Sequence, residues 1–197
     1  LSPERLKNEM VQERVKRMKV NLLAIDEAHC ISQWGYDFIP PYLEINQFRK
    51  LIPDVPVLAL TATATPKVVD DIQEKLDFKT KHVFKKSFKR DNLSYNVVKT
   101  ENIYGRLLEI LNRIPGTAII YTRNRRRTAE IASWLRQQGV VSSFYHAGLS
   151  TEEREKRQQH WLQNITRVMV CTNAFGMGID KPDVRLVLHL ELPDSPE

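Results

Sequence analysis

The chain is poor in cysteine and contains no long apolar run. Among its 197 residues there are only two cysteines, Cys30 and Cys171, and they lie far apart. Two such thiols form neither a disulfide framework nor a zinc site, so we expect both to be reduced, in a cytoplasmic, intracellular protein. No stretch of about 18 apolar residues occurs, so we expect no membrane-spanning helix and no membrane partner. The sequence also lacks the phosphate-binding pattern G-x-x-x-x-G-K-[ST].

The composition is that of a globular protein whose charge is unevenly distributed. Hydrophobic residues make up 42% of the chain and charged residues 27%, which fits one or two domains. The net charge is +6, but residues 79–136 hold 14 basic and 4 acidic residues, a local balance of +10 that leaves −4 elsewhere. Such a basic segment favours a polyanionic partner such as nucleic acid, although many charge runs only solvate helix faces.

One short stretch carries the strongest local signal for chemistry. The apolar residues 22–25 end abruptly at two carboxylates, Asp26 and Glu27. Such a run predicts a buried parallel strand, and ligands of open α/β sheets bind at the C-terminal ends of such strands. An Asp there can hold Mg²⁺ against nucleotide phosphates, and a neighbouring Glu can polarise the attacking water. The alternative is a strand that simply ends in a solvated acidic turn.

Predicted strands and helices alternate along most of the chain. Apolar periodicity and turn residues predict strands at 20–25, 55–60, 83–84, 93–98, 117–121, 140–145, 168–171 and 184–190. Helices are predicted at 42–51, 65–76, 103–114 and 123–138, with others beginning near residues 2 and 150. This order indicates an α/β fold in two doubly wound blocks, with a basic crossing at 85–92 and a cleft between paired lobes.

Helix ends and large side chains add local detail. Ser2, Thr65 and Ser150 are predicted N-caps, and Gly139 is predicted to end the helix before it. Trp134 and Trp161 fall on helix faces, which predicts that both belong to the core.

The segment after the two carboxylates is rich in aromatic residues. Four rings fall within nine residues, namely Trp34, Tyr36, Phe38 and Tyr42, and the Gly and Pro residues among them prevent a regular helix or strand. Rings in such a loop either pack into a core, as we expect for Tyr42, or stack on unpaired bases, at about 1–3 kcal/mol per base.

These stretches resemble the motifs of RecQ helicases, a family of superfamily 2. The tetrapeptide Asp26-Glu27-Ala28-His29 is similar to the DEAH box, and residues 30–38 resemble the aromatic-rich loop of RecQ proteins. The further matching blocks are 2–6, upstream of the DEAH box, 60–65 (LTATAT, motif III), 121–125 (motif IV), 145–149 (YHAGL) and 172–183 (TNAFGMGIDKPD, motif V). These blocks follow the family's order and run from end to end of the chain.

The resemblance implies a role for each matching residue. Asp26 would bind Mg²⁺ through water, Glu27 would act as the base for ATP hydrolysis, and His29 would couple hydrolysis to single-stranded DNA. The DNA-coupling loop would comprise Gln33, Trp34, Tyr36, Asp37 and Phe38. Thr61 and Thr63 would form the relay between the ATP and DNA sites. In the second lobe, the DNA path would comprise Asn124, Arg125, His146, Gly148 and Thr172. Gly178 and Asp180 of the same lobe would face the nucleotide.

Local alternatives and departures accompany these roles. Thr61 and Thr65 can instead cap a helix, and Arg126 and Arg127 can simply be solvated. The family usually has a basic residue at position 39 and His at position 36, and Cys, Asn and Ser at positions 122–124. Its adenine-reading motif, phosphate-binding loop and arginine finger are absent, and motif VI only begins, at 189–193. An arginine finger raises the rate of phosphoryl transfer by about 10³–10⁵-fold in the enzymes that use one.

The resemblance therefore implies two RecA-like lobes of the P-loop NTPase type, with parallel sheets. Residues 1–90 would be the C-terminal part of a truncated lobe 1, and residues 91–197 would be lobe 2. The expected function is that of a segment of an ATP-dependent 3′–5′ DNA helicase, acting on single-stranded or forked DNA in recombination and repair. ATP and Mg²⁺ would be its cofactors, and a bacterial protein would associate with the nucleoid.

Two other functions are compatible with the same residues. By itself the segment is expected not to hydrolyse ATP, so a non-catalytic nucleic-acid-binding or assembly module that retains the lobes is one alternative. An RNA helicase of the DEAD/DEAH type is the other, and the aromatic loop and the block at 175–178 argue against it. Nothing in the sequence points to a particular protein partner.

Overall fold

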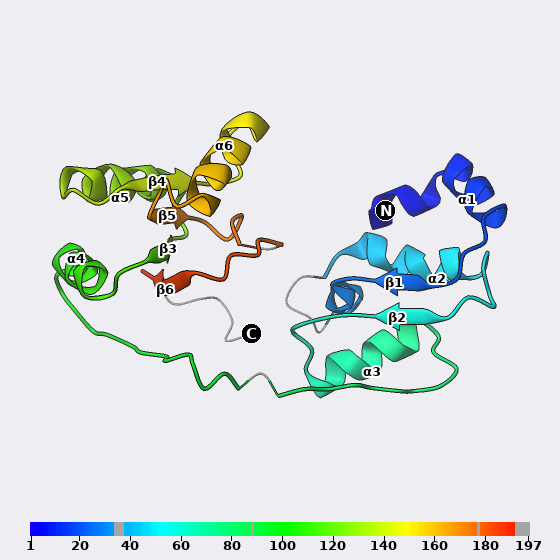
Figure 1. Ribbon diagram of the computed structural model, residues 1–197. Coiled ribbons are helices and arrows are strands. Elements are labelled where there is room, and N and C mark those ends of the chain that lie inside the picture. Colours follow the sequence, from blue (N-terminus) through cyan, green and yellow to red (C-terminus); the bar gives the residue numbers. More distant parts are fainter. Residues whose placement is uncertain (34–37, 88, 177, 192–197) are drawn as a thin grey trace. The chain divides into compact units, whose positions relative to one another are not determined.

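The chain folds as two compact units, with a boundary between Arg90 and Asp91 (Figure 1). The computed structural model describes residues 1–33, 38–87, 89–176 and 178–191. Three residues assigned to the DNA-coupling loop, Trp34, Tyr36 and Asp37, lie outside these ranges. Within them, no helix is both long and apolar enough to cross a bilayer.

The first unit is built on two parallel strands, β1 (Leu23–Ile25) and β2 (Val57–Ala59). Their register pairs Leu23 with Val57 and Ile25 with Ala59. The α-helices of this unit are α1 (Glu9–Lys16), α2 (Glu44–Arg49) and α3 (Pro66–Lys75), and its 3-10 helices are Pro3–Lys7, Ala28–Ile31 and Pro40–Leu43. Parallel pairing of β1 with β2 brings the C-terminal ends of both strands to the same edge.

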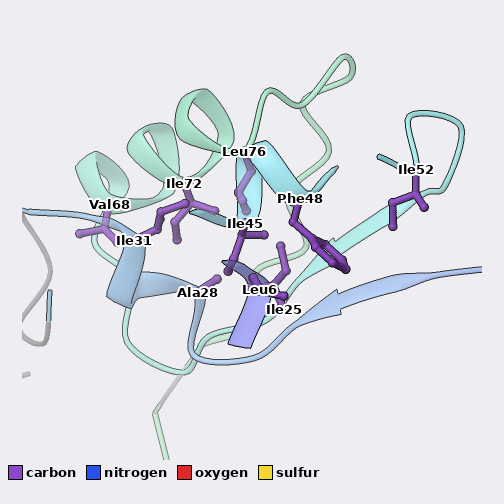
Figure 2. Close-up of a cluster of buried hydrophobic side chains, with 10 residues drawn as sticks. All are labelled: Leu6, Ile25, Ala28, Ile31, Ile45, Phe48, Ile52, Val68, Ile72 and Leu76. Carbon is purple, nitrogen blue, oxygen red and sulfur yellow. The ribbon is translucent and has the colours of Figure 1, made fainter. Parts of the chain in front are cut away.

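The core of the first unit lies where α2, α3 and the 3-10 helix after β1 meet the strands. Figure 2 shows the buried side chains that form it. These are Leu6, Ile25, Ala28, Ile31, Ile45, Phe48, Ile52, Val68, Ile72 and Leu76. The helix that begins at Pro66 presents Val68, Ile72 and Leu76 to this core, at the spacing of one helix face. The acidic turn after β1 is thus held by packing on the segment that follows it.

The second unit is a four-stranded parallel sheet with the order β4-β5-β3-β6. Its strands are β3 (Thr117–Tyr121), β4 (Ser142–Tyr145), β5 (Val168–Cys171) and β6 (Val184–His189). Its helices are α4 (Ile103–Arg113), α5 (Arg125–Gln137) and α6 (Thr151–Leu162). An α/β fold with parallel sheets in two successive units confirms the fold class predicted from the sequence.

Alternate residues of the two central strands pack against helices on opposite faces of this sheet. Ala118, Ile120, Val168 and Val170 share a cluster with side chains of α4 and α5. The intervening residues Ile119, Met169 and Cys171 share another cluster with Trp161 of α6. Because successive strand residues point to opposite faces, the buried runs of β3 and β5 require cover on both sides.

Two predicted strands are wrong. Residues 83–84 and 93–98 form no strand in the described part of the chain, and Phe84 and Val97 are 97% and 94% exposed. An alternating or apolar segment becomes a strand only when another strand supplies its hydrogen bonds, and local sequence does not specify that neighbour. The predicted ends of β1, β2 and β4 also extend beyond the observed strands.

The predictions near helix ends were mostly correct. Thr65 Oγ1 accepts a hydrogen bond from Val68 N at 3.4 Å, and Ser150 Oγ accepts one from Glu153 N at 3.2 Å. Gly139 follows α5 with a φ of 78°, as a C-terminal cap requires. The N-terminus differs, because Ser2 makes no side-chain cap. The helix α1, which Asn8 caps, was not predicted, and none of its residues is buried.

Candidate functional site

The two carboxylates of the acidic turn lie at the C-terminal edge of the first sheet. Backbone hydrogen bonds continue past the strand ends, from Leu60 N to Ile25 O at 2.8 Å and from Ala28 N to Leu60 O at 2.9 Å. Asp26 Oδ1 accepts a hydrogen bond from Glu27 N at 2.9 Å, and both acidic residues are exposed. The turn is fixed by its backbone, while its carboxylates are accessible to a ligand.

Glu27 adopts a backbone conformation that is unusual for its residue type. Its φ of 48° and ψ of 43° lie in the left-handed region. For a residue with a Cβ this conformation costs about 1–2 kcal/mol, and such residues gather at functional sites. The sharp reversal lets the chain leave the strand edge and enter the 3-10 helix Ala28–Ile31, whose residues are all buried.

This geometry predicts that glycine is tolerated at position 27 for folding. We expect Glu27→Gly to leave the free energy of unfolding unchanged or to raise it by up to about 1 kcal/mol, because glycine adopts the left-handed region without a Cβ clash. In the middle of α1, Glu13→Gly should instead cost about 1 kcal/mol. Urea unfolding of both variants measures the difference, and an equal loss at the two positions would contradict the prediction.

His29 connects the acidic turn to the end of β2. Its Nδ1 lies 2.9 Å from Thr61 Oγ1 and 3.4 Å from Glu27 Oε2, while its Nε2 lies 3.7 Å from Cys30 Sγ. The side chain is buried, with 7% of the residue exposed. Thr61 Oγ1 also accepts a hydrogen bond from Thr63 N at 3.2 Å. The structure therefore brings Thr61 to Glu27 and His29, although Thr61 lies 32 residues after His29 in the sequence.

Tyr42 supports the same turn through its side chain. Its hydroxyl donates to Asp26 O at 3.2 Å, and its ring packs partly against the core of the first unit. Burial raises the pKa of the Tyr42 hydroxyl, and the nearby groups of Cys30 and Glu27 raise it further. A neutral hydroxyl is the form that donates this hydrogen bond.

The described ends of the aromatic loop are Gln33, which is exposed, and Phe38, which is half-buried. Lys75 of α3 places its ammonium 5.9 Å from the centroid of the Phe38 ring, and the same group donates to Ile31 O at 3.1 Å. Lys75 also pairs with Asp71 at 3.0 Å. Sequence reasoning did not find Lys75, whose position in an amphipathic helix resembles that of any solvated lysine.

The predicted nucleic-acid-binding residues of the second unit follow three neighbouring strands. Asn124 and Arg125 come after β3, His146 and Gly148 after β4, and Thr172 after β5. The register aligns the last residues of these strands, Tyr121 and Tyr145 both with Cys171. Because the strands are parallel, the residues that follow them lie along one edge of the sheet.

Three of these residues are in close proximity. A Cβ added at Gly148 would lie 3.3 Å from His146 Nδ1 and 3.4 Å from Arg125 Nη1. His146 Nδ1 is buried and, within the described part of the chain, has no hydrogen-bond partner. Asn124 is the N-cap of α5, because its Oδ1 accepts from Arg126 N at 2.8 Å. Arg125 and Arg126 are exposed, so the start of α5 presents positive charge at this edge.

A carboxylate that lies just after β6 contacts residues at and before the start of α5. Glu191 accepts from Thr122 Oγ1 and from Arg123 N, both at 3.3 Å, and it also pairs with Arg127. Arg127 is thus ion-paired and half-buried, whereas the expectation from sequence was a solvated side chain. Sequence reasoning missed Glu191, because its partners lie more than sixty residues away.

The loop after β5 carries the residues predicted to face the nucleotide. Gly178, with a φ of 71°, and Asp180 are both exposed. Nearby, the Tyr121 hydroxyl donates to Phe175 O at 2.9 Å, and burial raises the pKa of Tyr121 to about 12. The Phe175 ring contacts Trp161 edge-on, with centroids 5.2 Å apart. This loop is therefore anchored from β3 and from α6.

The described residues contain no group of three or more His, Cys, Asp or Glu side chains that could form a metal site by themselves. A Mg²⁺ ion that binds through one or two carboxylates, with water and substrate phosphates as its other ligands, does not need such a group. The exposed Asp26 carboxylate fits that kind of site.

Two family profiles match the chain in sequence order. The DEAD/DEAH box helicase profile matches residues 1–72, and the helicase conserved C-terminal domain matches residues 101–197. The chain is 41% identical to the ATP-dependent DNA helicase RecQ of Bacillus subtilis and 40% identical to that of Pasteurella multocida, over 100% of its own length. It covers 34% and 31% of those two proteins, about a third of their length.

Among solved structures, Saccharomyces cerevisiae Dbp5 bound to RNA and ADP BeF3 has a TM-score of 0.63 with 21% identity. The match covers 93% of this chain and 49% of that one, and at this identity it shows the fold alone. Both units thus have the RecA-like fold. The two profiles together place the chain in the DEAD/DEAH box helicase family, and over its own length it is similar to RecQ proteins.

Proposed function

We propose that the chain is the part of an ATP-dependent 3′–5′ DNA helicase that couples ATP hydrolysis to movement along single-stranded DNA, in recombination and repair. Residues 1–90 would form the C-terminal part of lobe 1, and residues 91–197 would form lobe 2. The contact of His29 Nδ1 with both Glu27 and Thr61 carries this proposal, since it joins an acidic turn to a second motif through one buried ring. An intracellular protein acting on DNA in the cytoplasm, or at the nucleoid in bacteria, fits the proposal.

In the first unit, Asp26 would hold Mg²⁺ through water. In the second unit, Gly178 and Asp180 would be the residues that face a nucleotide. The metal would neutralise charge on the phosphates. Glu27 would accept a proton from the attacking water, because its carboxylate is exposed on a turn that backbone hydrogen bonds hold at the strand edge. His29 would transmit a change at the Glu27 carboxylate to Thr61 and Thr63, through its contact with Thr61 Oγ1 and the hydrogen bond from Thr63 N to that same oxygen.

DNA would be bound at two places. Next to the acidic turn, Gln33 and Phe38, with Trp34, Tyr36 and Asp37 between them, would contact bases. In the second unit, Asn124, Arg125, His146, Gly148 and Thr172 would follow the backbone of a single or forked strand. Exposed arginines at one sheet edge are suited to phosphate oxygens.

Single-strand binding by the purified chain tests this proposal. We expect a fluorescent oligonucleotide to bind weakly at low salt and to be released as salt rises, because phosphate contacts displace counterions. The double variant Arg125→Ala, Arg126→Ala should bind more weakly and should reduce the slope of log K against log salt by roughly 0.7 for each phosphate that the arginines no longer neutralise. Fluorescence anisotropy measures both quantities.

Arg113→Ala is the matched control for this experiment. Arg113 is also an exposed arginine, but it ends α4 and pairs with Glu109 at 2.9 Å. We expect this variant to bind like the wild-type chain. If the wild-type chain causes no anisotropy change at low salt, or if the control loses as much affinity as the double variant, the proposed DNA path is wrong.

A non-catalytic nucleic-acid-binding module is the second candidate. It is compatible with the exposed arginines at the start of α5, because phosphate contacts by these side chains do not require a nucleotide site. The two candidates differ in ATP turnover when a phosphate-binding loop is joined to these residues.

A further inference from the structure

The Cys30 thiol has no part in the function proposed above, yet it lies against the ring that links the two motifs. Cys30 Sγ is 3.7 Å from His29 Nε2, within hydrogen-bond distance for sulfur. Cys30 is 4% exposed and His29 is 7% exposed, so this contact is shielded from water. On the other side of the ring, Nδ1 faces Thr61 Oγ1 and Glu27 Oε2.

The neighbours of the ring determine which nitrogen carries the proton. A neutral imidazole has one N–H donor and one acceptor nitrogen. The Glu27 carboxylate can only accept, and Thr61 Oγ1 can accept as well, so Nδ1 is the nitrogen that gains from a proton. Nε2 is then an acceptor inside the core, and a thiol S–H is a donor that can satisfy it.

We propose that Cys30 is a positioning residue, whose thiol donates to His29 Nε2 and thereby holds the ring as its Nδ1–H tautomer, directed at Glu27 and Thr61. The consequence for coupling rests on the proposed function, because it matters only if His29 links hydrolysis to DNA. The tautomer itself is a property of the chain alone. It can therefore be tested without ATP or DNA.

The test is ¹⁵N NMR of the full chain labelled at its histidines, of which there are five. The two ring nitrogens of His29 are assigned by their loss in His29→Gln. We expect a protonated Nδ1 and an unprotonated Nε2 in the wild-type chain. In Cys30→Ala the ratio of the two tautomers should move toward Nε2–H about three- to tenfold, the range for loss of one weak hydrogen bond.

Two further variants separate donation by the thiol from its volume. Cys30→Ser retains a donor on a side chain of similar shape and should keep the wild-type ratio within about twofold. Cys171→Ala removes the other buried cysteine, which belongs to the second unit, and should leave the His29 signals unchanged. Unaltered His29 nitrogen shifts in Cys30→Ala, or equal changes in the Ala and Ser variants, would overturn the proposal.

The wild-type chain offers a second measurement in case Cys30→Ala does not fold. The infrared S–H stretch of Cys30, assigned by its loss in Cys30→Ser, should move to higher frequency in His29→Leu, because donation to a nitrogen weakens the S–H bond. An S–H frequency that is the same with and without the imidazole would show that the thiol does not donate to it.

Discussion

The Glu27→Gln substitution is expected to lower DNA-stimulated ATP hydrolysis by about 10²–10⁴-fold when these residues are joined to a phosphate-binding loop. Glutamine keeps the size and the left-handed backbone of Glu27 but cannot accept a proton from water. Nucleotide affinity should change little, since in the proposed mechanism the carboxylate acts on the attacking water and not on the bound phosphates. Release of inorganic phosphate, measured with and without single-stranded DNA, gives the rate.

Two controls accompany this measurement. Glu13→Gln removes an exposed carboxylate of α1 that pairs with Lys16 at 2.7 Å, and it should hydrolyse ATP at the wild-type rate. The 197-residue chain by itself should show no turnover, because it has no loop to hold the phosphates. Turnover by that chain, or full activity of Glu27→Gln, would contradict the assignment of the base. Equal inactivity of wild type and variant with the loop in place would favour the non-catalytic module.

Trp161→Ala is expected to cause the largest loss of stability in the second unit, about 3–5 kcal/mol. Trp161 is 1% exposed and packs under the sheet with Met169 and Cys171. Its ring also contacts Phe175, whose carbonyl accepts from Tyr121, so the cavity would lie under the loop that carries Gly178 and Asp180. We expect that loop to lose amide-exchange protection before the rest of the unit.

Trp134→Ala is the matched comparison. Trp134 is only half-buried on α5 and contacts Tyr104 edge-on at 4.9 Å. Its loss should cost about 1–2 kcal/mol, because less apolar surface leaves the core. Far-UV circular dichroism during urea unfolding measures the free energy of unfolding of both variants. Equal losses would show that Trp161 does not anchor the second unit.

The sequence was sufficient wherever structure depends on neighbouring residues. The bounds of β3 and β5, the caps Thr65 and Ser150 and the acidic turn after β1 were all predicted, since apolar runs and capping residues act within one turn or strand. The prediction of core positions for Trp134 and Trp161 was confirmed fully for Trp161 and in part for Trp134. The family followed from motifs, because their residues are contiguous.

Only the tertiary structure decided which distant groups meet. His29 and Thr61 are 32 residues apart, and Arg127 and Glu191 are 64 apart, yet each pair is in contact. Residues 93–98 alternate like a strand but pair with no strand in the described part of the chain. The physical reason is the same in each case. A hydrogen bond or ion pair needs a partner at a set distance, and only folding places residues from different parts of the chain at that distance.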